Sequence, residues 1–299
     1  MTVTITDPRR PPATRGERIR GWVALTKPRI IELLLTTTVP AMVLAARGWP
    51  GTWLVVATLV GGTMSAGGAN AINNFVDRDI DADMRRTKHR PLPAHRVAPG
   101  DALVVGTVLG VAGFAWLAGF VNLAAAVLAT AALAFYVLVY TLYLKRTTSH
   151  NIVIGGAAGA VPVLVGWAAV TGTVDLPAWI LFAIVFYWTP PHFWALALRF
   201  EDDYRRAGVP MLPVVAGAAA TARQILLYSV LLGGMTVLLH PVADLGWVYL
   251  AGSIVLGVAF VIEAARLVAD HRRAMLVFRF SNVYLTLLFV LIAVDVFVR

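Results

Sequence analysis

The chain has 299 residues, of which 59% are hydrophobic and only 14% are charged. A typical globular domain is about 45–50% apolar and about 25% charged, so this chain has too little polar surface to cover a water-soluble particle. The composition therefore excludes an ordinary soluble protein. Cysteine is absent, which also excludes a disulfide framework, a thiolate nucleophile and a cysteine-ligated metal site.

Long uncharged stretches alternate with short charged segments along the chain. Each stretch is close to the length that an α-helix needs to cross a hydrocarbon core of about 30 Å. A transmembrane β-barrel would instead show ~10-residue segments of alternating polarity. We therefore expect an all-α, polytopic membrane protein in the lipid bilayer. The nine predicted spans are residues 30–46, 52–76, 102–118, 123–144, 152–171, 178–198, 224–239, 247–262 and 282–298.

The basic residues indicate how the spans are oriented. A net charge of +9 can indicate nucleic-acid binding, but these residues cluster between apolar spans, so no nucleic-acid partner is expected. If the N-terminus is cytoplasmic, 23 of the 25 Lys and Arg residues lie inside, and only Arg47 and Arg299 lie outside. The positive-inside rule thus predicts a cytoplasmic N-terminus and an external C-terminus.

The first 24 residues are rich in Pro and Arg and contain no apolar core, so they do not form a secretory signal peptide. Their composition predicts a disordered cytoplasmic tail over residues 1–24. Residues 25–299 are expected to form one transmembrane domain. Because no organelle signal is present, the expected location is a bacterial plasma membrane, with the mitochondrial inner membrane as the second choice.

The first long cytoplasmic loop begins within the second predicted span. There, Asn73, Asp77 and Asp81 are spaced i, i+4 and i+8, and on a continuing helix they share one face at about 6 Å per step. Amide and carboxylate oxygens are ligands for Mg²⁺, which also keeps waters and substrate phosphate oxygens. Ionisable groups that enter a membrane helix are usually functional. We therefore expect a magnesium site, with Asp79 and Asp83 on the opposite side of the helix.

Four basic residues are candidate phosphate donors. Arg86 and Arg90 follow the acidic residues, and Lys145 and Arg146 follow the fourth span. Guanidinium groups bind phosphate oxygens in a bidentate manner. A solvated, salt-bridged loop or anchoring at lipid headgroups explains the same residues, and this alternative stays open.

A second acidic cluster lies in the loop after the sixth span. Glu201, Asp202 and Asp203 are followed there by two arginines. Two acidic clusters on one membrane face can hold a diphosphate between them through metal ions. A salt-bridged surface loop is the alternative interpretation.

These motifs together resemble the UbiA intramembrane prenyltransferase superfamily, whose first signature is N-x-x-x-D-x-x-x-D. The similarity runs from about residue 23 to the C-terminus, and the narrower motifs resemble the subgroup that farnesylates haem. Those motifs are D-R-D-I-D at 77–81, R-P-L-P at 90–93, T-P-P-H-F-W at 189–194, D-Y at 203–204 and A-G-V-P-M-L-P at 207–213.

The resemblance implies nine helices around a central cavity that opens to the cytoplasmic side. It implies that farnesyl diphosphate alkylates a vinyl group of haem B and that water addition gives haem O. Mg²⁺ is the implied cofactor, and haem A synthase, which uses the product, is an implied partner. Many superfamily members carry D-x-x-x-D in the second motif, whereas Ala207 stands four residues after Asp203 here. The D-Y match favours Asp203 as the fourth catalytic metal ligand beside Asn73, Asp77 and Asp81.

Aromatic residues are candidates to contact the allylic cation that forms when the diphosphate leaves. A cation-π contact contributes about 0.5–2 kcal/mol, and Tyr143 and Trp194 are candidates for haem or prenyl contact. His192 is the histidine that we expect to contact haem, although a structural hydrogen-bonding role is the alternative. It follows Pro190 and Pro191, which are expected to break or kink the helix.

Two other functions are consistent with parts of the sequence. The first is prenylation of a quinone precursor or another aromatic acceptor, which uses the same diphosphate chemistry. The second is a transporter or a non-catalytic haem-handling membrane protein. That function explains the spans and the basic loops, but it gives no reason for Asn73, Asp77 and Asp81 to share a face.

Overall fold

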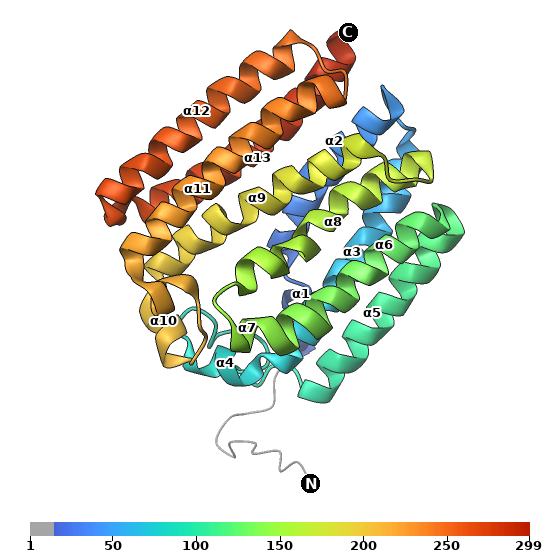
Figure 1. The fold of residues 1–299 in the computed structure, drawn as a ribbon. Coiled ribbons are helices and arrows are strands. Elements are labelled where there is room, and N and C mark those ends of the chain that lie inside the picture. The colour runs from blue at the N-terminus through green and yellow to red at the C-terminus, as the bar shows by residue number, and fades with distance from the viewer. Residues whose placement is uncertain (1–14) are drawn as a thin grey trace.

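The computed structural model describes the backbone of residues 15–299 and, apart from residues 15, 17, 18 and 29–35, their side chains. Over the described residues the chain is a bundle of helices with no strand (Figure 1), which confirms the expected all-α class. The chain is a multi-span membrane protein, because many of these helices are both long and apolar.

Eight helical segments of the described chain are long and apolar enough to cross a membrane. The ninth predicted span corresponds to α2 (Pro28–Ala46), whose described apolar stretch, Thr36–Ala46, is shorter. The count of nine and the orientation therefore stay predictions. The eight segments are α3 (Thr52–Val76), α5 (Pro99–Phe120), α6 (Leu123–Ala134) with its continuations η1 (Phe135–Leu144) and α7 (Lys145–Thr147), α8 (Asn151–Thr171), α9 (Leu176–Arg199), α11 (Leu212–Val242), α12 (Trp247–Ala269), and η2 (His271–Arg273) with α13 (Ala274–Val298).

Three short helices lie together at one end of the bundle: α4 (Arg78–Asp83), α7 and α10 (Glu201–Arg206). We call this the polar end. The C-terminus lies at the opposite end (Figure 1). Since both long charged loops meet at the polar end, the segments that the sequence marks for polar chemistry are brought together there.

Helix α1 (Arg15–Leu25) covers part of the segment that we expected to be a disordered tail. It is tied to α3 because the side-chain amides of Asn70 and Asn74 donate to the carbonyls of Thr26 and Leu25, at 3.2 and 3.1 Å. Leu25 is fully buried. The rest of the expected tail, residues 1–14, lies outside the described residues.

The segment η1 is a π-helix of ten residues that continues α6. Within it, the side-chain hydroxyl of Thr141 donates to the backbone carbonyl of Tyr136, five residues earlier, at 2.8 Å. A π-helical segment changes the angular phase of the residues that follow it and is frequent at functional sites. Here it precedes Lys145 and Arg146, which begin α7.

Of the two expected effects of Pro190 and Pro191, a break or a kink, the break does not occur, because α9 runs from Leu176 to Arg199 with both prolines inside it. Hydrogen bonds hold the two residues directly before the prolines. The Trp188 indole donates to the carbonyl of Ser281 in α13 at 2.7 Å, and the Thr189 hydroxyl donates to the carbonyl of Val185 at 2.8 Å. Packing against neighbouring helices commonly lets membrane helices tolerate prolines.

Candidate active site

Asp77 joins α3 to α4 at the polar end. Its backbone (φ −84°, ψ 6°) leaves the ideal helix, but the i→i−4 hydrogen bonds of Asp77 to Asn73 and of Asp81 to Asp77 persist, at 2.9 and 2.8 Å. The side chains of Asn73, Asp77 and Asp81 are therefore all directed inward, and these residues are only 3%, 0% and 1% exposed. The Asn73 amide donates to Asp77 Oδ2 at 2.7 Å.

Each of these three polar side chains meets a cation of the protein. Lys145 Nζ lies 2.5 Å from Asp77 Oδ2. Arg90 donates to both oxygens of Asp81, at 2.9 and 2.7 Å. Two of the predicted phosphate donors thus neutralise the two carboxylates that we predicted as metal ligands.

Lys27 is a site residue that sequence reasoning missed. Its Nζ donates to Asn73 Oδ1 at 2.7 Å, from the linker between α1 and α2, where the residue adopts a left-handed backbone (φ 51°). Burial lowers the pKa of Lys27 well below its ordinary value, and the nearby charges of Arg90 and Lys145 lower it further. The sequence signal was a Lys-Pro pair directly before the first apolar span.

Thr141 is a second missed residue. Its hydroxyl accepts from the Asn73 amide at 3.1 Å, and the side chain is fully buried. The residue lies within the π-helical η1, which α-helical periodicity does not describe.

Arg146 lies between the buried Asp77 and the exposed Asp79 of α4. It makes a two-pronged contact with Asp79, at 2.8 Å for each prong, and its Nη2 lies 3.7 Å from Asp77 Oδ1. The hydrogen bonds from Arg146 hold the pKa of Asp79 down, at about 2. Asp79 and Asp83 are exposed, on the side of α4 away from Asp77 and Asp81, as the helical spacing predicts.

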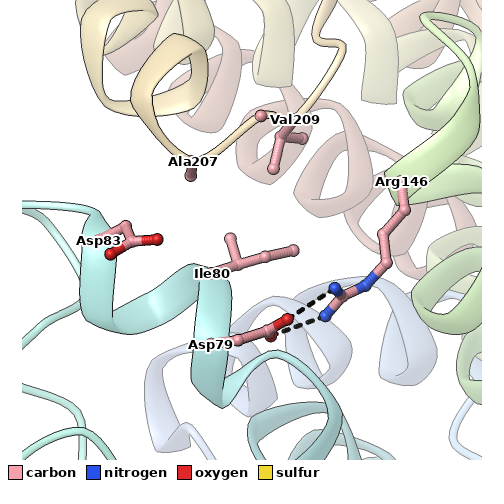
Figure 2. Close-up of a pocket in the computed structure, with 7 residues that line it drawn as sticks. Asp79, Ile80, Asp83, Arg146, Ala207 and Val209 are labelled. Atoms are coloured by element: carbon pink, nitrogen blue, oxygen red, sulfur yellow. Dashed lines mark hydrogen bonds and ion pairs between the residues drawn. The ribbon is translucent and has the colours of Figure 1, made fainter.

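A pocket of ≈170 Å³ opens beside this contact, between α4 and the segment after α10. In Figure 2 the Asp79–Arg146 pair lies along one side of the pocket, Asp83 lies at the other side, and Ala207 and Val209 face them from across the opening. Its polar side chains come from α4 and α7, and the second acidic loop supplies the apolar side opposite them. It lies at the polar end of the bundle.

Asp203 links α10 to the first loop. Its Oδ2 accepts from the backbone N–H of Arg86 at 3.1 Å, and Oδ1 pairs with Arg206. The Arg86 guanidinium donates to the Tyr204 hydroxyl at 3.2 Å. Asp202 is exposed and Glu201 pairs with Arg205, so of the three acids Asp203 is the one that contacts the first loop.

The three aromatic candidates lie in different surroundings. Tyr143 is 63% exposed on η1, so the structure does not bring it to the buried acids. Trp194 is buried, with its ring 5.4 Å from that of Tyr228. His192 is buried between aromatic rings of α9 and α13.

The oxygen donors at Asn73, Asp77 and Asp81 suit Mg²⁺ chemically. Asp77 Oδ1 is buried without a hydrogen-bond donor, because 3.7 Å to Arg146 is too long for a hydrogen bond. The described residues contain no group of three or more His, Cys, Asp or Glu side chains that could hold a metal ion. Mg²⁺ commonly takes only one or two carboxylates and completes its shell with waters and phosphate oxygens, so the residues present fit this ion.

The fold and the buried polar cluster define an intramembrane prenyltransferase: residues 34–291 match the UbiA prenyltransferase family, and the chain belongs to it. Among individual proteins, the chain is similar to protoheme IX farnesyltransferases. That of Parafrankia sp. is 54% identical over 286 residues, which cover 94% of this chain and 91% of the relative. Protoheme IX farnesyltransferase 1 of Saccharopolyspora erythraea is 57% identical over 290 residues, which cover 95% and 92%.

Solved structures support the same fold. A structure of digeranylgeranylglyceryl phosphate synthase superposes with a TM-score of 0.78 at 18% identity, covering 95% of this chain and all of that one. A UbiA homologue from Archaeoglobus fulgidus bound to DMAPP and Mg²⁺ gives a TM-score of 0.68 at 14% identity, covering 91% and 99%. At these identities the likeness concerns the fold alone.

Proposed function

We propose that this chain transfers the farnesyl group of farnesyl diphosphate to a vinyl group of haem B, with addition of water, to give haem O and diphosphate. The observation that carries the proposal is the identity of 54% and 57% to protoheme IX farnesyltransferases over more than nine-tenths of the chain. Protoheme IX is haem B, so the acceptor follows from the activity for which those relatives are named.

The four predicted phosphate donors bind and orient the diphosphate. Arg90 and Lys145 exchange their carboxylate partners for diphosphate oxygens, while Arg146 lines the opening and Arg86 contacts Tyr204 of the second loop. Charge-assisted hydrogen bonds to phosphate are among the strongest that proteins make. Asn73, Asp77 and Asp81 on the first loop, and Asp203 on the second, would hold Mg²⁺ ions between the two loops, and the metal would supply Lewis-acid stabilisation of the leaving oxygens.

The reaction breaks the carbon–oxygen bond to the diphosphate and forms a carbon–carbon bond to the outer vinyl carbon. Water then adds its hydroxyl group to the inner vinyl carbon, and one proton is released. The protein's residues stabilise the charge that develops on the leaving group. The apolar interior of the bundle limits access of bulk water to the allylic cation.

The finer assignments of location and partner belong to the same proposal. A multi-span protein with bacterial relatives fits a bacterial plasma membrane, with the polar end toward the cytoplasm. The product, haem O, is the substrate that a haem A synthase would take over, so we expect that enzyme as a partner.

Membranes that contain the chain test the proposal when incubated with haem B, labelled farnesyl diphosphate and Mg²⁺. We expect label in a haem fraction that is absent from membranes without the chain. A parallel incubation replaces haem B by a prenyl-accepting aromatic such as a quinone precursor. Label in that product and none in haem would overturn the acceptor, and no transfer to either would overturn the enzymatic function.

A further inference from the structure

His192 is clamped between two aromatic rings. The Trp188 ring stacks on it at 4.3 Å between centroids, and the Phe278 ring stacks at 4.6 Å, with interplanar angles of 20° and 30°. Phe193 lies nearly perpendicular to it at 5.1 Å. The stacked rings cover both faces of the imidazole, and the residue as a whole is 9% exposed.

The hydrogen bonds of Ser281 determine which ring nitrogen carries the proton. A serine hydroxyl has one proton to donate, and Ser281 donates it to the carbonyl of Phe278 at 2.7 Å. Ser281 Oγ also lies 2.8 Å from His192 Nδ1. Since the hydroxyl proton is already used, Oγ accepts in this second bond, and His192 Nδ1 must be the donor.

The proton on Nδ1 leaves Nε2 with a free lone pair. The ring contacts three aromatic side chains and a hydroxyl, and none of these groups carries charge, so an imidazolium here would be a buried, unpaired cation. A neutral imidazole carries a proton on one nitrogen only. Nε2 makes no hydrogen bond to the described residues. An unprotonated imidazole nitrogen is a good ligand for iron.

We propose that Ser281 is a positioning residue that holds His192 as the Nδ1–H tautomer, so that Nε2 coordinates the iron of the substrate haem. The inference rests on the proposed function for the presence of haem. Ser281 is itself fixed, because its carbonyl accepts from the Trp188 indole at 2.7 Å. Residues that orient a metal-binding histidine in this way typically change metal affinity by about 10–100-fold when they are removed.

The test uses the full chain in lipid nanodiscs, titrated with ferric haem B and followed by visible absorption and electron paramagnetic resonance. The wild-type complex should show a histidine-ligated spectrum, and His192→Ala should lose it and regain it with added imidazole. Ser281→Ala should weaken haem binding about 10–100-fold. An unchanged spectrum in His192→Ala would overturn the proposal.

Ser253→Ala is the matched control for Ser281→Ala. The Ser253 hydroxyl is also buried and donates to a carbonyl three residues earlier, that of Leu250, at 2.9 Å. No ring nitrogen accompanies this bond in the described chain. Ser253→Ala should therefore bind haem like the wild type, and equal losses in the two variants would make Ser281 merely structural and overturn its role.

Binding of farnesyl diphosphate, measured in the same samples, shows whether each variant is folded. If His192→Ala does not fold, isotope-labelled histidine in the unmutated protein replaces it: hyperfine coupling to a histidine nitrogen supports the proposal, and its absence contradicts it. A histidine-ligated haem complex without farnesyl transfer would refute the proposed function alone. Transfer without histidine ligation would refute this inference alone.

Discussion

Lys145 Nζ lies 2.5 Å from Asp77 Oδ2. The cation that directly follows the fourth predicted span thus pairs with the carboxylate that directly follows the second predicted span. The Asp77 side chain is fully buried, and that of Lys145 is only 13% exposed. Diphosphate carries more negative charge than one carboxylate, which makes it an effective competitor for Lys145. Binding of the donor substrate is thus expected to rearrange this pair.

Replacement of Asp77 by asparagine tests the catalytic role of the buried carboxylate. Asp77→Asn keeps the size of the side chain and removes its charge, so we expect the protein to be expressed and inserted. Farnesyl transfer should fall about 10²–10³-fold, as when a group that stabilises the transition state is lost. The rate of label transfer to haem measures this effect.

Asp101→Asn is the matched control, because Asp101 is an exposed aspartate in the first turn of α5 and does not line the pocket. It should retain the wild-type rate within about twofold. Wild-type transfer in Asp77→Asn would instead contradict a catalytic role for Asp77.

Arg90→Ala should raise the KM for farnesyl diphosphate. Arg90 contacts both oxygens of Asp81, so it stands beside the predicted diphosphate site. Loss of a charged hydrogen-bond donor costs about 1.5–3 kcal/mol, which corresponds to a rise of roughly ten- to a hundredfold. Steady-state kinetics at saturating haem provide the measurement.

Arg85→Ala removes an exposed arginine of the same loop and should change this KM little. A thermal unfolding scan of both variants separates loss of binding from loss of the Asp81 ion pair. Equal KM values for the two variants would contradict a specific role for Arg90.

Gly68→Ala should destabilise the bundle. A methyl group at Gly68 would lie 2.7 Å from the carbonyl oxygen of Gly106 and 2.9 Å from the backbone nitrogen of Gly110. These are backbone atoms of α5 that cannot rotate away, and close approach at small residues is how membrane helices pack. Overpacking costs about 1–3 kcal/mol, measurable as a lower midpoint of thermal unfolding in detergent.

Gly62→Ala on the same helix provides the comparison, because a methyl group there meets no atom within 4 Å. Its unfolding midpoint should match or exceed that of the wild type. If both substitutions lowered the midpoint equally, close packing of α3 on α5 would not explain the loss.

The Asp79–Arg146 pair predicts a defined pH dependence. The pKa of Asp79 is about 2, below its ordinary value of 3.8, so the pair contributes stability above pH 4 and loses it as the pH falls toward 2. Because Asp79 is exposed, this contribution should stay below about 1 kcal/mol. The difference in unfolding midpoint between wild type and Asp79→Asn should therefore be constant from pH 5 to 8 and shrink below pH 4. A difference that changes between pH 5 and 8 would contradict this assignment.

Much of the fold followed from hydropathy alone. The second predicted span, 52–76, has the bounds of α3, because its apolar run ends where Asp77 begins. Hydropathy predicts membrane spans and not the full length of a helix that extends beyond its span. Helix α11 therefore begins at Leu212, twelve residues before the predicted start of its span at residue 224. Gly217 interrupts the regular backbone within it, with φ 77°.

The site was predictable where it depends on α-helical spacing within one segment. Asn73, Asp77 and Asp81 lie as that spacing requires, whereas the partners of these residues depend on contacts between distant segments. The pairing of Lys145 with Asp77, 68 residues earlier, is such a contact. Tyr143 is exposed on the π-helical η1, and α-helical periodicity does not anticipate a π-helix.

The π-helical η1 lies between α6, which is part of a membrane-spanning segment, and Lys145 at the polar end. An α-helix rotates about 100° per residue, so one residue more or fewer between Phe135 and Leu144 would turn Lys145 away from Asp77 while leaving α6 in its place. Deletion of a single residue in η1 would therefore redirect the polar end independently of the helix before it. That makes this segment a point at which substrate recognition can diverge between relatives that keep the same bundle.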